Sequence, residues 1–358
     1  MRFAAALLAI LLILIILWDA FETIILSRRV SRKFRITRAF YRLLWAPWRT
    51  VARLVPEGNR RENTLMIFGP LSLILLLALW ALGLVASFGV LYWGTGSRVT
   101  APAGLSGLWA DLYMSGTTFF TLGLGDVTPS ATLPRVLAVA EAGMGFAFLA
   151  MMIGYLPLIS QAFSRREVKI SMLDARAGSP PTAVALVRRY GKERAEDLAD
   201  LLREWERWSA ELLESHVSFP VLAYFRSQHD NQSWVSSLTT ILDSCAFMMA
   251  RREETVADPA GLTFAMARHA VVDLCAVFRL KPEPPPRDRL SPAERARLDS
   301  LLAAAGVQVR SDPACFEKLT ALRNMYEPYV QALSRFLMMP LPAWVPPGES
   351  RDNWQHSP

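Results

Sequence analysis

One short stretch of the chain, Thr117–Pro129 (TTFFTLGLGDVTP), has the residue types and the spacing to bind a dehydrated cation. Within it, Gly123 and Gly125 alternate with larger residues, and Asp126 closes the run. Because glycine adopts positive φ as readily as negative φ, a glycine at every second position lets successive carbonyls turn to the same side. A column of such oxygens can replace the water shell of a cation. The stretch therefore predicts an ion-binding loop.

Two long apolar segments, Leu65–Trp93 and Pro134–Phe163, lie on either side of this loop and must position it. At ~1.5 Å per residue, each is long enough to cross a hydrocarbon core of ~30 Å. A short helix is expected just before the loop, from Ser106, whose hydroxyl can cap it, to about Phe120. Its negative C-terminal end would favour a cation in the cavity below.

The composition indicates a membrane protein. Hydrophobic residues make up 52% of the 358 residues, and the mean hydropathy is +0.24. A third apolar run begins at Phe3 and ends before a group of arginines, without a small-x-small cleavage site, so Phe3–Leu26 is expected to be a retained helix. Asp19 and Glu22, near its end, either reach the membrane interface or pair with those arginines. The predicted fold class is an all-α membrane protein with three transmembrane helices, one re-entrant helix and loop, and a helical cytoplasmic domain.

The sequence TLGLGD at Thr121–Asp126 resembles the selectivity filter of the potassium-channel pore-loop family, in which T-V-G-Y-G-D is usual. The resemblance covers about Leu65–Phe163 and implies a homotetramer, since each chain supplies one loop and a ring of carbonyls needs four. It implies the following site: K⁺ bound by the carbonyls of Thr121, Leu122, Gly123 and Leu124, a filter completed by Gly125 and Asp126, filter support from Thr117, Thr118 and Glu141, and a gating hinge at Gly145.

Three residues need separate comment. Leu124 replaces the usual aromatic residue and cannot donate its hydrogen bond, which leaves the strictness of K⁺ over Na⁺ selectivity open. Phe120 stands where a second threonine is common. For Glu141, a neutral acid hydrogen-bonded to a hydroxyl of the preceding helix (Ser115, Thr117 or Thr118) is favoured over a role in permeation. The glycines of the inner helix fit either a hinge or close packing.

Basic residues mark the cytoplasmic side. Residues 28–61 hold eleven of them: Arg28, Arg29, Arg32, Lys33, Arg35, Arg38, Arg42, Arg49, Arg53, Arg60 and Arg61. By the positive-inside rule this segment is cytoplasmic, which places the N-terminus and the mouth of the loop outside the cytoplasmic membrane and the C-terminal domain inside the cell. The net charge of +7 is therefore assigned to contact with anionic lipid and not to nucleic acid.

Phe34–Leu54, which contains Pro47, is interpreted as an interfacial helix, with a gating lever as the alternative.

The chain after Ser164 is predicted to be helical. Expected helices are Thr182–His216, Ser233–Arg252, Leu262–Leu280 (with Asp258-Pro259 just before it), one capped by Ser291, and one from Asp312 to about Met339. No G-x-G-x-x-G motif follows a strand, which gives no support for a nucleotide-binding domain. A metal site built from Cys245, Cys275, Cys315, His216, His229 and His269 is disfavoured against buried thiols and ordinary histidines. No family is identified for this part, and a ligand or protein partner is left open.

Taken together, these patterns predict a tetrameric K⁺ or K⁺-preferring channel that conducts passively and is regulated by its C-terminal domain, with no enzymatic activity and no cofactor besides the permeant ion. The alternative is a non-conducting or weakly selective signalling or scaffold protein. The predicted organisation is an N-terminal transmembrane helix at 1–27, a basic segment at 28–64, a pore domain at 65–163 (pore helix 106–120, filter 121–126, inner helix 134–163), a helical domain at 164–339 and a Pro-rich tail at 340–358.

Overall fold

The computed structural model describes residues 1–26, 35–96, 99–190, 194–229, 231–251, 257–307 and 309–346. These residues are mostly helical, and one short antiparallel pair joins strand β1 (Val99–Thr100) to β2 (Thr128–Pro129). Four of the helices are long and apolar enough to cross a membrane. The chain is therefore an all-α membrane protein, as its sequence predicts. It forms two units, residues 1–54 with 67–161 and residues 55–66 with 162–358.

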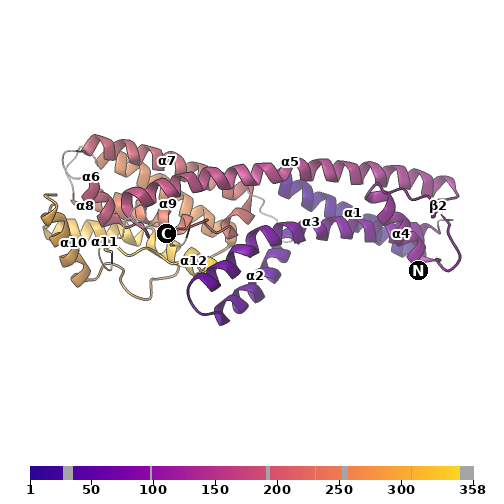
Figure 1. Ribbon diagram of the computed structural model, residues 1–358, viewed down its shortest axis with the longest axis horizontal. Coiled ribbons are helices and arrows are strands. Elements are labelled where there is room, and N and C mark those ends of the chain that lie inside the picture. Colours follow the sequence, from indigo (N-terminus) through magenta and orange to yellow (C-terminus); the bar gives the residue numbers. More distant parts are fainter. Residues whose placement is uncertain are drawn as a thin grey trace, which may run out of the picture. The chain divides into compact units, whose positions relative to one another are not determined.

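The first unit is built around three long helices, the amphipathic helix that follows the first of them, and the short helix of the loop. The helices are α1 (Arg2–Ile24), α2 (Ile36–Leu54), α3 (Asn59–Thr95), α4 (Leu108–Phe119) and α5 (Thr132–Ala177), the last of which continues into the second unit (Figure 1). The core of the unit joins alanines and isoleucines of α1 to Trp80, Leu84 and Phe88 of α3 and to Met114 of α4. A Cβ on Gly94 would lie 2.7 Å from the backbone nitrogen of Ala6, so the small residue lets α1 and α3 approach closely.

Asp19 of α1 links three helices. Its Oδ2 accepts hydrogen bonds from the Thr37 backbone N–H (3.1 Å) and hydroxyl (2.6 Å) at the start of α2, and from Trp80 Nε1 of α3 (3.2 Å). Glu22 Oε2 lies 3.5 Å from Arg35 Nε, and Asp19 Oδ1 lies 4.0 Å from the same atom. The pairing expected for these two acids is therefore found with Arg35, whereas Arg28, Arg29, Arg32 and Lys33 lie outside the described residues.

The amphipathic segment forms α2 and continues through Pro47 without a break. Trp45 and Trp48 pack against Phe68 of α3, with ring centroids 4.7 Å and 5.7 Å apart. Part of the apolar face of α2 therefore contacts protein, while Arg42 and Arg53 remain exposed.

The second unit contains the remaining helices. They are α6 (Ala183–Tyr190), α7 (Ala195–Ser218), the 3₁₀ helix η1 (Pro220–Tyr224), α8 (Trp234–Arg251), α9 (Ala257–Phe278), α10 (Pro292–Ala304), α11 (Pro313–Asn324) and α12 (Glu327–Leu337) (Figure 1). The apolar α9 is the fourth candidate membrane span, but it packs against α7 and α8, and its Thr263 hydroxyl donates to the Leu202 carbonyl of α7 (2.9 Å). Because α7 is rich in charged residues, we read α9 as the core helix of this unit, which leaves three spans.

Two helices predicted as continuous in the second unit are each divided into two. The single helix expected over Thr182–His216 is two, α6 and α7, and the sequence between them contains Gly191, a poor helix former. The last helix breaks between α11 and α12, because Pro328 lies in the first turn of α12, where a proline is tolerated, and cannot continue α11. The caps at Ser291 and Asp312 are confirmed by hydrogen bonds from Glu294 N and Cys315 N.

One further expectation for this unit changes. Helix α9 begins at Ala257, so Asp258 and Pro259 lie inside its first turn. The tail also packs on the domain over its described part, residues 340–346. There Trp344 is fully buried, and its carbonyl accepts from Val184 N (3.4 Å).

Cys245, Cys275 and Cys315 are free, buried thiols, and no group of three His, Cys, Asp or Glu that could hold a metal occurs among the described residues.

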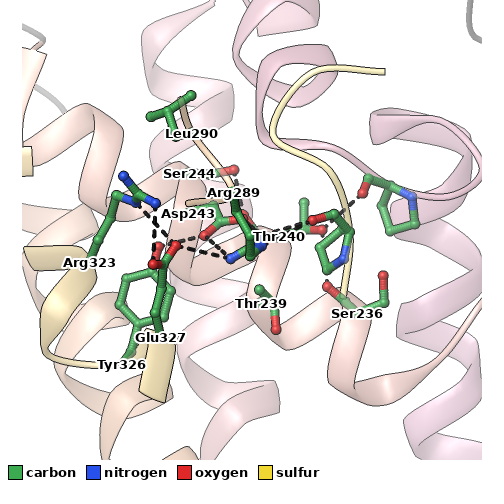
Figure 2. A network of polar contacts seen from close by, with 12 residues as sticks. Ser236, Thr239, Thr240, Asp243, Ser244, Arg289, Leu290, Arg323, Tyr326 and Glu327 are labelled. Carbon is green, nitrogen blue, oxygen red and sulfur yellow. Dashed lines mark hydrogen bonds and ion pairs between the residues drawn. The ribbon is translucent and has the colours of Figure 1, made fainter. Parts of the chain in front are cut away.

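A buried polar network joins α8, α11, α12 and the tail (Figure 2). Arg289 donates to Asp243 Oδ2 of α8 (2.5 Å) and to the Pro342 carbonyl (2.9 Å), and Tyr326 OH donates to Asp243 Oδ1 (2.5 Å). Burial, with Asp243 beside it, holds the pKa of Tyr326 well above its ordinary value of 10.0, so the phenol stays a donor. Glu327 accepts from Arg289 and from Arg323.

Arg289→Met is expected to destabilise the protein by about 3–5 kcal/mol, because it leaves the carboxylate of Asp243 buried without its cation. The matched control is Arg335→Met, which removes an exposed pair with Glu283 and is expected to cost at most about 1 kcal/mol. Denaturant unfolding of the full-length protein in detergent measures both. Equal effects of the two substitutions would contradict the prediction.

His216 of α7 is buried and neutral. Its Nδ1 lies 2.9 Å from the Leu212 carbonyl and donates to it, and its Nε2 lies 3.3 Å from Nη1 of Arg166. Since a guanidinium can only donate, Nε2 must be the acceptor. Burial, and then the charge of Arg166, hold the pKa of His216 well below its ordinary value of 6.5.

This arrangement predicts a loss of stability in acid. Because the pKa is lower in the folded state, the unfolded chain binds more protons below about pH 6.5, and stability falls as the pH drops through that value, by up to about 1.4 kcal/mol per pH unit. Unfolding of wild type, His216→Gln and the exposed control His269→Gln is compared across this range. The free energy of unfolding is expected to depend less steeply on pH only in His216→Gln. Equal pH dependence in all three proteins would exclude His216 as the cause.

Candidate ion-conduction site

The helix before the loop is slightly shorter than predicted. α4 spans Leu108–Phe119, and its N-cap is Gly107, at φ 59°, with no side-chain cap hydrogen bond. The predicted cap at Ser106 is therefore wrong, because the positive φ at this position suits glycine. At the other end, the Phe120 N–H bonds to Gly116 O (3.1 Å), and the chain leaves the helix.

The loop alternates its backbone conformation residue by residue. φ is +57° at Thr121, +55° at Gly123 and +79° at Gly125, whereas Leu122 and Leu124 do not have positive φ. The alternation predicted from the two glycines is present, and it extends to Thr121, a non-glycine residue in a conformation that costs roughly 1–3 kcal/mol. A chain that alternates the sign of φ in this way turns successive carbonyls toward one side.

Helix α4 holds the start of the loop through main-chain bonds. Thr121 N donates to Thr118 O (3.0 Å), and both Leu122 N (2.8 Å) and Gly123 N (3.3 Å) donate to Thr117 O. The Thr117 hydroxyl donates to Met114 O within α4 (3.0 Å). The contact of Thr117 and Thr118 with the loop is thus made by their carbonyls, which lie at the C-terminal end of α4 where carbonyls lack helical partners.

Glu141 of α5 is completely buried and meets two hydroxyls. Its Oε1 lies 2.5 Å from Ser115 Oγ of α4, and its Oε2 lies 2.7 Å from Tyr92 OH of α3. Of the three partners considered from the sequence, Ser115 is the one found. Tyr92 is fully buried, and its phenol pairs with the acid. An ionisable residue in an apolar helix needs a polar partner at the same depth in the membrane. This requirement could have identified Tyr92 as a partner of Glu141 from the sequence.

Asp126 at the end of the loop is also anchored to α4. Tyr113 OH donates to its Oδ2 (2.8 Å), and Val127 N donates to its Oδ1 (3.1 Å). The β1–β2 pair begins two residues later, at Thr128. Sequence reasoning did not identify Tyr113 as the partner of Asp126.

Gly145 lies against the end of α4. A Cβ there would lie 2.0 Å from the Phe119 carbonyl oxygen, so α5 and α4 meet at a point where only glycine fits. Close packing therefore accounts for this glycine, and the hinge remains a prediction.

Large apolar side chains of the loop are uncovered in the single chain. Phe120, Leu122 and Leu124 are each more than half exposed.

Comparison with known proteins agrees with this geometry. Residues 74–157 match the family model Ion_trans_2, described as "Ion channel". The chain is also 27% identical over 206 residues, 56% of its length, to the "Uncharacterized membrane protein YdjJ" of Bacillus subtilis (strain 168), and the match spans 58% of that relative. No solved structure matches the chain. Residues 74–157 are thus similar to the pore domain of ion channels.

Proposed function

We propose that the protein is a homotetrameric channel that conducts K⁺, or prefers K⁺, passively across the cytoplasmic membrane. The observation that carries the proposal is the alternating φ of Thr121–Gly125, which directs a column of carbonyls to one side. K⁺ would exchange its water for the carbonyls of Thr121, Leu122, Gly123 and Leu124, and repulsion between ions in adjacent sites would drive exit.

The proposed tetramer is supported by the cost of leaving a single loop without partners. Carbonyls that face the membrane interior without partners each cost several kcal/mol, and four loops around one axis convert them into cation ligands. The exposure of Phe120, Leu122 and Leu124 supports this, because neighbouring subunits would cover apolar surface that the single chain leaves open.

The deciding experiment is ion flux. Purified protein in liposomes with a K⁺ gradient is expected to give flux that Ba²⁺ blocks, and repetition with Na⁺ measures the selectivity that Leu124 leaves open. A folded tetramer without flux would support the alternative of a signalling or scaffold protein. Equal K⁺ and Na⁺ flux would identify a weakly selective channel.

The proposed orientation places the N-terminus and the loop mouth outside and the second unit in the cytoplasm, because the basic residues of 28–61 favour the inner side. A tag inserted after Arg61 is expected to be reached only from the cytoplasm, and a tag within Gly94–Ala103 only from outside. Labelling of intact cells and of inverted vesicles measures this, and reversed labelling would overturn the orientation.

Contact with lipid and regulation by the second unit belong to the same proposal. The exposed Arg42 and Arg53 of α2 would contact anionic headgroups at the inner leaflet. Regulation by the second unit would act through α5, which is one continuous helix from Thr132 to Ala177. Its Arg166 donates to the carbonyls of Leu222 (2.9 Å) and Phe225 (2.9 Å), which fixes the end of α5 within that unit.

A further inference from the structure

The buried carboxyl of Glu141 is the point at which α5 meets both α4 and α3. Three short oxygen–oxygen contacts run through it in a chain: Tyr92 OH to Oε2 (2.7 Å), Oε1 to Ser115 Oγ (2.5 Å), and Ser115 Oγ to the Val85 carbonyl of α3 (2.8 Å). Each distance is that of a hydrogen bond, so each contact needs one proton.

Counting the protons shows what Glu141 must be. Tyr92 and Ser115 each contribute one hydroxyl proton, and the Val85 carbonyl can only accept. With an ionised Glu141, two protons serve three contacts, and either Ser115–Val85 or Ser115–Glu141 becomes a repulsive approach of two oxygens. With a protonated Glu141, all three are satisfied: Tyr92 donates to Oε2, Oε1–H donates to Ser115, and Ser115 donates to Val85.

The charges around the group agree with the count. In the described part of the chain, no Lys, Arg or His forms an ion pair with Glu141. The titratable group in contact with it is Tyr92 of α3, and the acid Asp111 of α4 lies near that tyrosine; neither supplies a positive charge. A carboxylate with no cation in a fully buried membrane site is costly, whereas a neutral acid is not.

We propose that Glu141 is a permanently neutral carboxylic acid that positions the selectivity filter by clamping α4 between α5 and α3. Ser115 lies less than one turn before Thr117 and Thr118, whose carbonyls hold the first filter residues, so a shift of Ser115 moves the base of the filter. Glu141 is thus a positioning residue. The inference rests on the proposed channel function for its effect on conduction, and on the hydrogen-bond geometry alone for the protonation state.

The test compares Glu141→Gln with Glu141→Ala. Glutamine reproduces the neutral acid, since its NH₂ can donate to Ser115 and its carbonyl can accept from Tyr92. Glu141→Gln is therefore expected to keep K⁺ flux and K⁺/Na⁺ selectivity within about twofold of wild type, whereas Glu141→Ala should lower flux about tenfold, as expected when buried hydroxyls lose a partner. Val139→Ala, an exposed truncation on the same helix, is the control and should leave flux unchanged.

An infrared measurement keeps the inference testable if Glu141→Ala fails to assemble. The infrared difference spectrum of wild type minus Glu141→Gln is expected to show the C=O stretch of a protonated carboxylic acid. Absence of that band, or a Glu141→Gln variant as impaired as Glu141→Ala, would overturn the inference, because either result requires a charged Glu141. Wild-type protein without flux would overturn the channel proposal and the positioning role, while the infrared band would still decide the protonation state.

Discussion

Gly123→Ala is expected to abolish K⁺ flux while leaving the protein folded. Gly123 has φ +55°, and an L-residue with a Cβ costs roughly 1–2 kcal/mol in that conformation. In the single chain a Cβ at this position meets nothing within 4 Å, so the fold should survive. In a tetramer the strain applies four times around one axis, and relaxation of φ would turn the carbonyls of Leu122 and Gly123 away from the ion. Flux into liposomes, with the oligomer confirmed by size-exclusion chromatography, measures the effect.

The matched control is Gly116→Ala in α4. A Cβ there meets Val85 Cγ1 at 3.8 Å, an ordinary contact, and alanine favours the helix by about 1 kcal/mol over glycine. This variant is expected to conduct like the wild type. Normal K⁺ flux from Gly123→Ala, with the tetramer intact, would remove the filter assignment.

The features that the sequence predicts correctly are those set by local chemistry. The alternating backbone follows from glycine at positions 123 and 125, whose lack of a Cβ is visible in any sequence. The caps at Ser291 and Asp312 follow from side chains that bond a backbone N–H three residues on. Membrane helices follow from long apolar runs. Helix α1 has nearly the predicted bounds, whereas α3 begins at Asn59, before the predicted start at Leu65.

The features that the sequence does not predict depend on which residues reach the same depth in neighbouring helices. Tyr92 and Glu141 are 49 residues apart, and Trp80 and Asp19 are 61 apart. Their pairing depends on how far one helix slides along another, which apolar periodicity leaves undetermined. The positive φ of Thr121 also depends on contacts with a neighbouring helix. Hydrogen bonds to the end of α4 impose this φ on a residue type that rarely adopts it.

Gly145→Ala is expected to damage assembly of the pore, and it separates packing from hinging. On helix propensity alone, alanine at this position of α5 should stabilise the helix by about 1 kcal/mol. The structure predicts that the substitution lowers stability instead. The new Cβ would lie 2.0 Å from the Phe119 carbonyl oxygen and 2.8 Å from its carbon, both backbone atoms that cannot rotate away. Overpacking of this kind costs about 1–3 kcal/mol or more in each subunit.

Two glycines of the same helix provide the controls for Gly145→Ala. A Cβ on Gly143 or on Gly154 meets nothing within 4 Å in the chain, so Gly143→Ala and Gly154→Ala are expected to leave thermal stability and K⁺ flux unchanged or to raise stability slightly. Thermal unfolding in detergent and liposome flux are measured on all three variants. A pure hinge predicts a different pattern, in which Gly145→Ala is as stable as Gly143→Ala and changes only the opening of the channel. A stable, well-assembled Gly145→Ala with altered gating would therefore assign Gly145 to bending, whereas loss of stability confined to Gly145→Ala would show that this glycine keeps α5 in contact with the end of α4, directly beneath the filter.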